Sequence, residues 1–168
     1  MTGGSSKTFI GALFLLASAW PSVGLPAEAR TAKSHPVDFR HDDVQAQRIA
    51  KRALGKDFSE EEDAPSGANS LRTAWVKLSP DRAPALLVMY GCSPTGNCGL
   101  YGFERAKSGW RQILNSLAQM CSILPSSHGG RRDISAYMHG SATDGILRTY
   151  RWRRNRYVQV SERGIVFK

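Results

Sequence analysis

Polar and apolar residues alternate with a period of two from Leu71 to near the end of the chain. This period is typical of strands, and turn residues interrupt it every 8–12 positions. The segment 84–91 (PALLVMYG) is continuously apolar, which predicts a central strand covered on both faces. The pattern predicts an α+β fold with an antiparallel β-sheet meander of about seven or eight short strands, drawn from 71–79, 84–91, 99–105, 109–115, 118–125, 132–140, 146–152 and 156–160.

A different period precedes the strands and predicts one N-terminal amphipathic helix over 42–54. Asp42 is the expected N-cap, with Gln45 three residues later as in a capping box, and Gly55 follows the last turn. The apolar stripe of this helix is small, which suits packing on a sheet, and it consists of Ala46, Ile49, Ala50, Ala53 and Leu54.

The first 29 residues have the layout of a secretory signal peptide. Lys7 precedes an apolar run of 12 residues, Phe9 to Trp20, and Ala27-Glu28-Ala29 forms a small-x-small cleavage site. The run is short for a membrane span, and no later segment approaches 18 apolar residues. We therefore expect a soluble mature protein, periplasmic or secreted, with a leader and acidic linker over 30–70 and a β domain over 71–168.

The chain is basic, with 23 Lys and Arg, 14 Asp and Glu, and a formal net charge of +9. A basic exported protein is attracted to anionic surfaces, so an acidic protein or an anionic envelope component is the expected partner. Nucleic acid is not expected, because the basic residues are mostly scattered and exported proteins rarely meet it. The segment 57–70 carries five acids in its first seven residues and is expected to be a solvated linker.

Two cysteines five residues apart, Cys92 and Cys98, lie in the turn-rich segment YGCSPTGNCGLYGF. A zinc site would need further ligands, a redox motif would be C-x-x-C before a helix, and a phosphate loop would need Gly-Lys-Ser/Thr. In an exported protein, a Cys92–Cys98 disulfide closing a hairpin is favoured, worth about 2–3 kcal/mol. The alternative is that Cys121 pairs with one of the two; otherwise Cys121 is expected to be a buried thiol.

A series of strand and turn motifs runs through 71–160: the turn Ser79-Pro80-Asp81, the run PALLVMYGC, the cysteine loop, GLYGFER, Gly109-Trp110-Arg111 and YRWRRNRYVQV. This order resembles small exported (periplasmic) bacterial proteins of unassigned function whose strands carry FG-GAP/VCBS-like motifs. The resemblance implies an exported β-rich domain. It implies no calcium site, because Asp81 stands alone where the calcium-binding turns of such repeats have several Asp or Asn residues.

Candidate catalytic groups lie in SSHGGRRD and nearby, where Ser126 or Ser127 could act with His128, or His139 with Asp133 or Asp144. The segment reads more simply as a polar turn, and no G-x-S-x-G elbow is present. The few acids of the strand region lie near turns or strand ends, which argues against a buried carboxylate pair. We therefore expect no enzyme, no cofactor and no metal; the alternative is an envelope hydrolase using His128 or His139.

The segment ILRTYRWRRNRYVQV interleaves arginines with aromatic residues. The simpler interpretation is that aromatic side chains fill the core while arginines keep an edge strand soluble. The functional interpretation is a binding surface, because Arg and aromatic residues are enriched in interface hot spots. On this basis we expect a non-catalytic binding domain of the bacterial cell envelope; a structural domain that oligomerises through edge strands is a further alternative. The expected partner-binding residues are Arg148, Arg151, Trp152, Arg153, Arg154 and Arg156.

Overall fold

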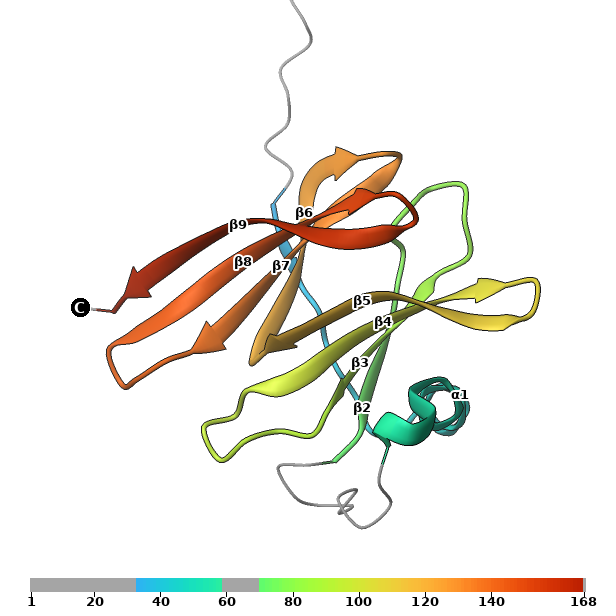
Figure 1. Cartoon of the computed structure of the whole chain (residues 1–168), viewed down its shortest axis with the longest axis horizontal. Helices are drawn as coiled ribbons and strands as arrows, with labels where there is room; N and C mark the ends of the chain where they lie inside the picture. Colours follow the sequence, from blue (N-terminus) through green and yellow to red (C-terminus); the bar gives the residue numbers. More distant parts are fainter. Residues whose placement is uncertain (1–32, 59–69, 168) are drawn as a thin grey trace, which may run out of the picture. The chain divides into compact units, whose positions relative to one another are not determined.

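Nine strands, one α-helix and one short 3₁₀ helix make up residues 33–58 and 70–167, which the computed structural model describes (Figure 1). The predicted signal peptide (1–29) and most of the predicted acidic linker lie outside these residues. The elements are β1 (His35–Pro36), α1 (Val44–Leu54), η1 (Gly55–Asp57), β2 (Arg72–Val76), β3 (Ala85–Tyr90), β4 (Cys98–Ala106), β5 (Gly109–Ala118), β6 (Met120–His128), β7 (Arg131–His139), β8 (Asp144–Arg153) and β9 (Arg156–Val166).

The strands form two antiparallel sheets rather than the single meander that the sequence predicts. One sheet has the order β2-β3-β4-β5 and the other β1-β6-β7-β8-β9 (Figure 1). The chain changes sheets between β5 and β6, where a single residue, Gln119, separates the strands. One residue is too short for a hairpin loop. The Gln119 amide instead donates to the Tyr137 carbonyl of β7 at 2.7 Å, which directs the chain into the second sheet.

Two strands differ from the sequence prediction in extent. The expected loose leader contains β1, which pairs with β6 through His35 opposite Ile123 and Pro36 opposite Ser122. A strand of two residues is too short to show a period, and a Pro fits because β1 is an edge strand. β9 extends to Val166 instead of ending near residue 160, because its backbone pairs with β8 although its side chains no longer alternate in polarity.

The main core lies between the two sheets, and a second core lies between the four-stranded sheet and α1. β3 contributes to both, as predicted for 84–91. Its Leu87 and Met89 face the five-stranded sheet, whereas Leu86 and Val88 face the helix. All six residues of β3 are buried, so the prediction of a strand covered on both faces is confirmed.

The helix α1 is confirmed, but its N-cap is Asp43 rather than Asp42. The Asp43 carboxylate accepts from the Ala46 amide at 2.8 Å and from the Trp75 indole N–H at 2.9 Å. The contact with Trp75 on β2 ties the start of the helix to the sheet, a tertiary contact that local spacing cannot reveal. The predicted stripe is confirmed, since its residues are buried in the second core or packed against it.

The predicted Cys92–Cys98 disulfide is confirmed, and Cys121 is a buried free thiol. Burial raises the pKa of Cys121 to about 12, so the thiol stays protonated and unreactive at neutral pH. Between the cysteines, the Asn97 side chain donates to the His139 carbonyl at 2.8 Å and accepts from its amide at 2.9 Å. The cysteine loop of one sheet is thereby joined to the end of β7 in the other.

No helix in the described part of the chain is long and apolar enough to span a membrane.

Candidate partner-binding site

The hairpin of β8 and β9 ends in a two-residue turn made of Arg154 and Asn155. Both residues have positive φ angles, 47° and 69°. Positive φ at both central positions is the mark of a type I′ turn, for which Asn and Gly are the usual residues. An arginine at the first position is therefore locally unfavourable.

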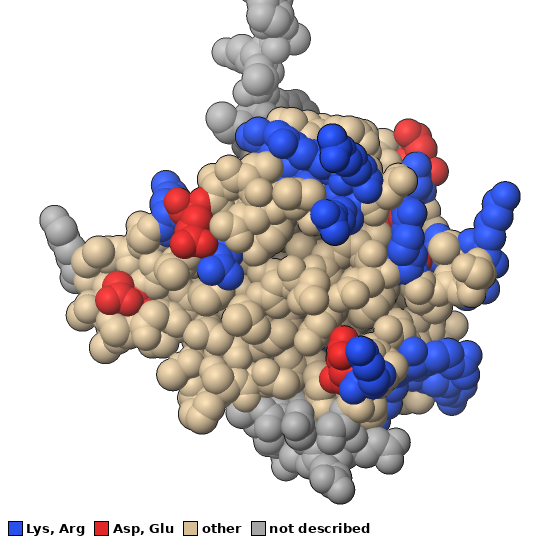
Figure 2. All heavy atoms as spheres, viewed as in Figure 1, with Lys and Arg blue, Asp and Glu red and all other residues tan. Residues whose placement is uncertain are grey.

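Arg153 and Arg156 lie directly opposite each other across this turn. Both are exposed, as is Arg154, and none of the three forms an ion pair with a carboxylate in the described residues. Like charges opposite each other destabilise a hairpin. Figure 2 shows basic side chains gathered over the end of this hairpin. We call Arg153, Arg154 and Arg156 the arginine tip.

Trp152 directly precedes the arginine tip on β8 and packs against Arg131 and Tyr157. The Arg131 guanidinium carbon lies 3.6 Å from the centroid of the Trp152 ring, and Tyr157 meets that ring edge-on at 5.3 Å. A Cβ at Gly129 would come within 2.9 Å of Trp152 Cδ1. Trp152 is thus enclosed on several sides, so in this arrangement it positions the hairpin and packs against the main core.

Arg131 in turn is buried and donates to Glu104 of β4 at 2.5 Å, while Arg111 of β5 donates to the other carboxylate oxygen. Burial raises the pKa of Glu104, but the hydrogen bonds from Arg111 and Arg131 outweigh it, and the net pKa lies below the usual value. The carboxylate therefore stays ionised and links the two sheets next to the arginine tip.

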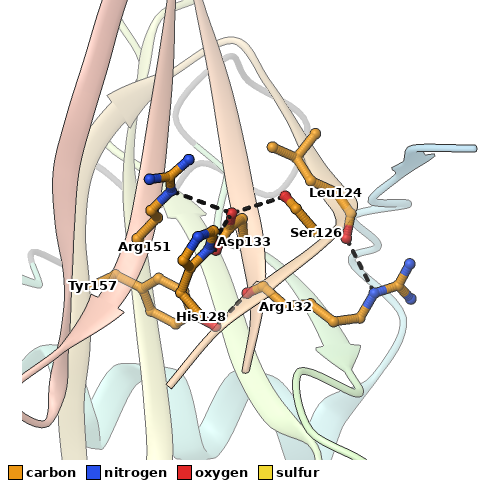
Figure 3. Close-up of polar contacts among 7 residues, drawn as sticks. All are labelled: Leu124, Ser126, His128, Arg132, Asp133, Arg151 and Tyr157. Atoms are coloured by element: carbon orange, nitrogen blue, oxygen red, sulfur yellow. Dashed lines mark hydrogen bonds and ion pairs between the residues drawn. The ribbon is translucent and has the colours of Figure 1, made fainter. Parts of the chain in front are cut away.

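Arg151 and Arg148, unlike the arginine tip, have carboxylate neighbours in the part of the chain that the structure describes. The Nε atom of Arg151 lies 3.6 Å from Asp133 Oδ2 and is buried without a hydrogen bond (Figure 3). Arg148 donates to Glu162 at 2.8 Å and contacts the Met138 sulfur at 3.1 Å. Of the six arginine and tryptophan residues predicted to bind a partner, the structure therefore gathers three that have no carboxylate partner among the described residues, and it assigns structural contacts to the others.

A groove runs from the arginine tip between β5 and β9. Its volume is about 720 Å³, within the range of ligand sites. β5 and β9 are the terminal strands of their sheets, so each presents an edge that no other described strand covers. Ser116 of β5 and Tyr150 of β8 bond to each other at 2.5 Å within its wall. Polar and aromatic side chains line it, among them Tyr101, Gln112, Asn115, Arg148, Arg156 and Gln159.

Three of the candidate catalytic residues, Ser126, His128 and Asp133, come together, but not as a triad. Asp133 is 1% exposed and accepts from Ser126 Oγ at 2.8 Å (Figure 3). Nδ1 of His128 lies 2.8 Å from the same carboxylate oxygen. A triad requires the serine to bond the histidine, whereas here both bond the acid. His139 is held elsewhere, through the contacts of its backbone with Asn97.

Two features of this region were not predicted. Glu104 and Asp133 lie close to strand ends, as predicted, but both are buried, which the sequence did not lead us to expect. Their burial follows from arginine, serine and histidine partners on other strands, which a single segment cannot show. The groove was missed because alternation of side chains does not distinguish an edge strand from an inner strand, and the groove lies between the edge strands β5 and β9.

Comparisons with protein-family models, curated proteins and solved structures find no match for this chain. The resemblance to FG-GAP/VCBS-like strands therefore stays a prediction.

Proposed function

We propose that this protein is an exported, non-catalytic binding domain of the bacterial cell envelope that captures an acidic segment of another protein. The segment would lie extended in the groove between β5 and β9, with its carboxylates at the arginine tip. The observation that carries the proposal is the arginine tip, which has no carboxylate partner among the described residues and in which Arg153 faces Arg156 across a turn that places Arg154 at positive φ. Local rules broken together in this way are expected at functional sites.

An extended polypeptide fits the groove better than a lipid or a polyanion does. Free strand edges offer backbone donors and acceptors, and adding a strand to such an edge is a common mode of peptide recognition. Both walls of the groove are edges of this kind. Arg156 lies at the boundary of the groove and the tip, where it can reach an acidic side chain of a bound strand.

Two features support export: the segment 1–29 has a signal-peptide layout, and the Cys92–Cys98 disulfide suits an oxidising compartment.

The proposal is tested by charge reversal at the tip. The probe is an eight-residue peptide that alternates Glu and Val, titrated against the purified protein at low and moderate salt. We expect the wild-type protein to bind it and Arg153→Glu/Arg156→Glu to bind at least tenfold more weakly, which is about 1.4 kcal/mol. Affinity should also fall as salt rises, because exposed charges are screened. Arg151 is left unchanged, because a carboxylate there would meet buried Asp133.

The matched control is Arg82→Glu/Lys107→Glu, which changes the net charge equally at exposed positions outside the groove. It should keep the wild-type affinity within about twofold, apart from long-range electrostatics. A peptide with N-methylated backbone amides should bind more weakly than the unmodified one. Equal binding by both double variants, no binding by the wild-type protein, or stronger binding to phosphatidylglycerol vesicles than to the peptide would contradict the proposal. Dimerisation through β5 and β9 in place of peptide binding would favour the oligomerising alternative.

The alternative of an envelope hydrolase using His128 or His139 has weaker support. The contact of His128 with Asp133 would orient a general base, but Ser126 Oγ already donates to the same carboxylate. His128 is not among the described residues that line the groove, the cavity beside β1 or the cavity beside Phe167.

A further inference from the structure

A second cavity, separate from the groove, lies between the two sheets near the cysteine loop. Its volume is about 540 Å³, and it reaches from Arg72 and Met89 of the four-stranded sheet to Leu147 and Ile165 of the other. Phe167 closes part of the wall: its backbone amide donates to the Thr143 carbonyl at 2.8 Å, and its ring meets Tyr137 at 5.9 Å.

The wall of this cavity is mainly apolar and carries one charged side chain among its described residues, that of Arg72. The described hydrogen bonds of the Arg72 side chain go to the disulfide, at 3.2 Å to Cys98 Sγ and 3.5 Å to Cys92 Sγ. Sulfur is a weak acceptor, and no carboxylate of the described residues pairs with this guanidinium. Arg72 is partly buried, so its guanidinium is a cation at an apolar wall with which an anion entering the cavity can pair.

Large apolar side chains are exposed at this cavity. Met120 is 58% exposed and Phe167 49%, and both line it. Such side chains together mark a surface that an apolar ligand would cover.

We propose that this cavity binds a long-chain aliphatic carboxylate, a fatty acid. The guanidinium of Arg72 holds the carboxylate, because its planar pair of N–H donors matches the two carboxylate oxygens. The hydrocarbon chain lies along Met89, Leu147 and Ile165 and ends near Phe167. Charge complementarity selects the anionic head, and the apolar wall selects the chain. This site does not depend on the arginine tip or on peptide binding.

The test uses dodecanoate below its micelle-forming concentration, with dodecanol as an uncharged analogue of the same length. We expect one dodecanoate per protein and a binding at least tenfold tighter than that of dodecanol. Dodecanoate should also raise the thermal unfolding temperature, because a ligand that binds the folded state stabilises it. Arg72→Gln should remove the preference for the carboxylate, so that both probes bind equally. Arg72→Lys should retain part of the preference, since the charge remains without the fork.

Two further variants separate loss of the site from loss of the fold. Ile165→Trp fills the cavity and should weaken both probes at least tenfold while Arg72 is intact. Arg105→Gln removes an exposed arginine outside the cavity and should change neither affinity. Cooperative unfolding and an intact disulfide show that each variant is folded. No binding of dodecanoate to the wild-type protein, no preference over dodecanol, or a preference that survives in folded Arg72→Gln would overturn the proposal.

Discussion

Glu104 accepts hydrogen bonds from two arginines on different strands, Arg111 of β5 and Arg131 of β7. Arg131 also stacks on Trp152, so one carboxylate connects the four-stranded sheet to the base of the arginine tip. The sequence shows these residues as separate charges near turns. Their association depends on how two sheets face each other, which no local pattern encodes.

This connection predicts a dependence of stability on acid. Burial opposes ionisation of Glu104, but the two arginines lower its folded pKa below the ordinary value of 4.5. A carboxyl group whose pKa is lower in the folded than in the unfolded protein stabilises the fold. This stabilisation is fully present above the pKa of the unfolded protein and is lost as the pH falls through the pKa of the folded protein. Glu104→Gln should therefore be less stable than the wild-type protein at pH 7, and the difference should shrink below about pH 4.

Urea unfolding at pH 7 and at successive pH values down to 3 measures this difference. Glu162→Gln is the control. Glu162 pairs with Arg148 at the surface, so its substitution should lower the free energy of unfolding less than Glu104→Gln does. A gap between Glu104→Gln and wild type that stays constant with pH would contradict the assignment.

At the scale of elements, the strand pattern was predictable and the division into sheets was not. Each of the eight predicted segments corresponds to a strand from β2 to β9, because alternation of side chains, or a short continuous apolar run in the case of β3, indicates a strand whatever its neighbours are. The two-sheet arrangement depends on Gln119, whose amide bonds to β7. The disulfide and the arginines of the candidate site were predictable from residue type and spacing, but the groove depends on which strands end their sheets.

The turn of the β8–β9 hairpin gives a prediction about stability and binding together. Arg154→Asn/Asn155→Gly installs the usual type I′ residues and removes one charge from the tip. We expect it to stabilise the protein by about 1 kcal/mol, since an arginine at positive φ is unfavourable.

The same variant should bind the acidic peptide more weakly than the wild-type protein does. Thermal unfolding and peptide titration measure the two effects, and Arg163→Asn, on β9 away from the turn, is the control. A variant that gains stability and keeps full affinity would show that Arg154 has no part in binding.

At the scale of the whole molecule, the described part of Thr31–Lys168 belongs to one compact unit. The cysteine loop helps to join its sheets, because Asn97 pairs with both backbone groups of His139. Asn97→Ala should lower the free energy of unfolding by about 1–3 kcal/mol, since it leaves these groups without their partner. Thr95 lies in the same loop and its hydroxyl bonds to Ser93 of that loop, so Thr95→Ala should lower the free energy of unfolding less than Asn97→Ala does.

Reduction of the disulfide should remove about 2–3 kcal/mol from the wild-type protein. It should remove less from Asn97→Ala, because the disulfide holds Asn97 in position and the two contributions are coupled. Urea unfolding of both proteins, oxidised and reduced, gives the four free energies required. Strict additivity would show that the disulfide and the hydrogen bonds of Asn97 with His139 stabilise the protein independently.

The Cys92–Cys98 disulfide also determines when the chain acquires its full stability. A loss of 2–3 kcal/mol is a large share of the roughly 5–15 kcal/mol that holds a domain folded. A chain exported as we propose would first be in the reducing cytosol, where the disulfide does not form. Without the stability that the disulfide adds, the chain is easier to keep unfolded for translocation. Oxidation after translocation would then close the cysteine loop, from which Asn97 bonds to β7, in the compartment where the protein acts.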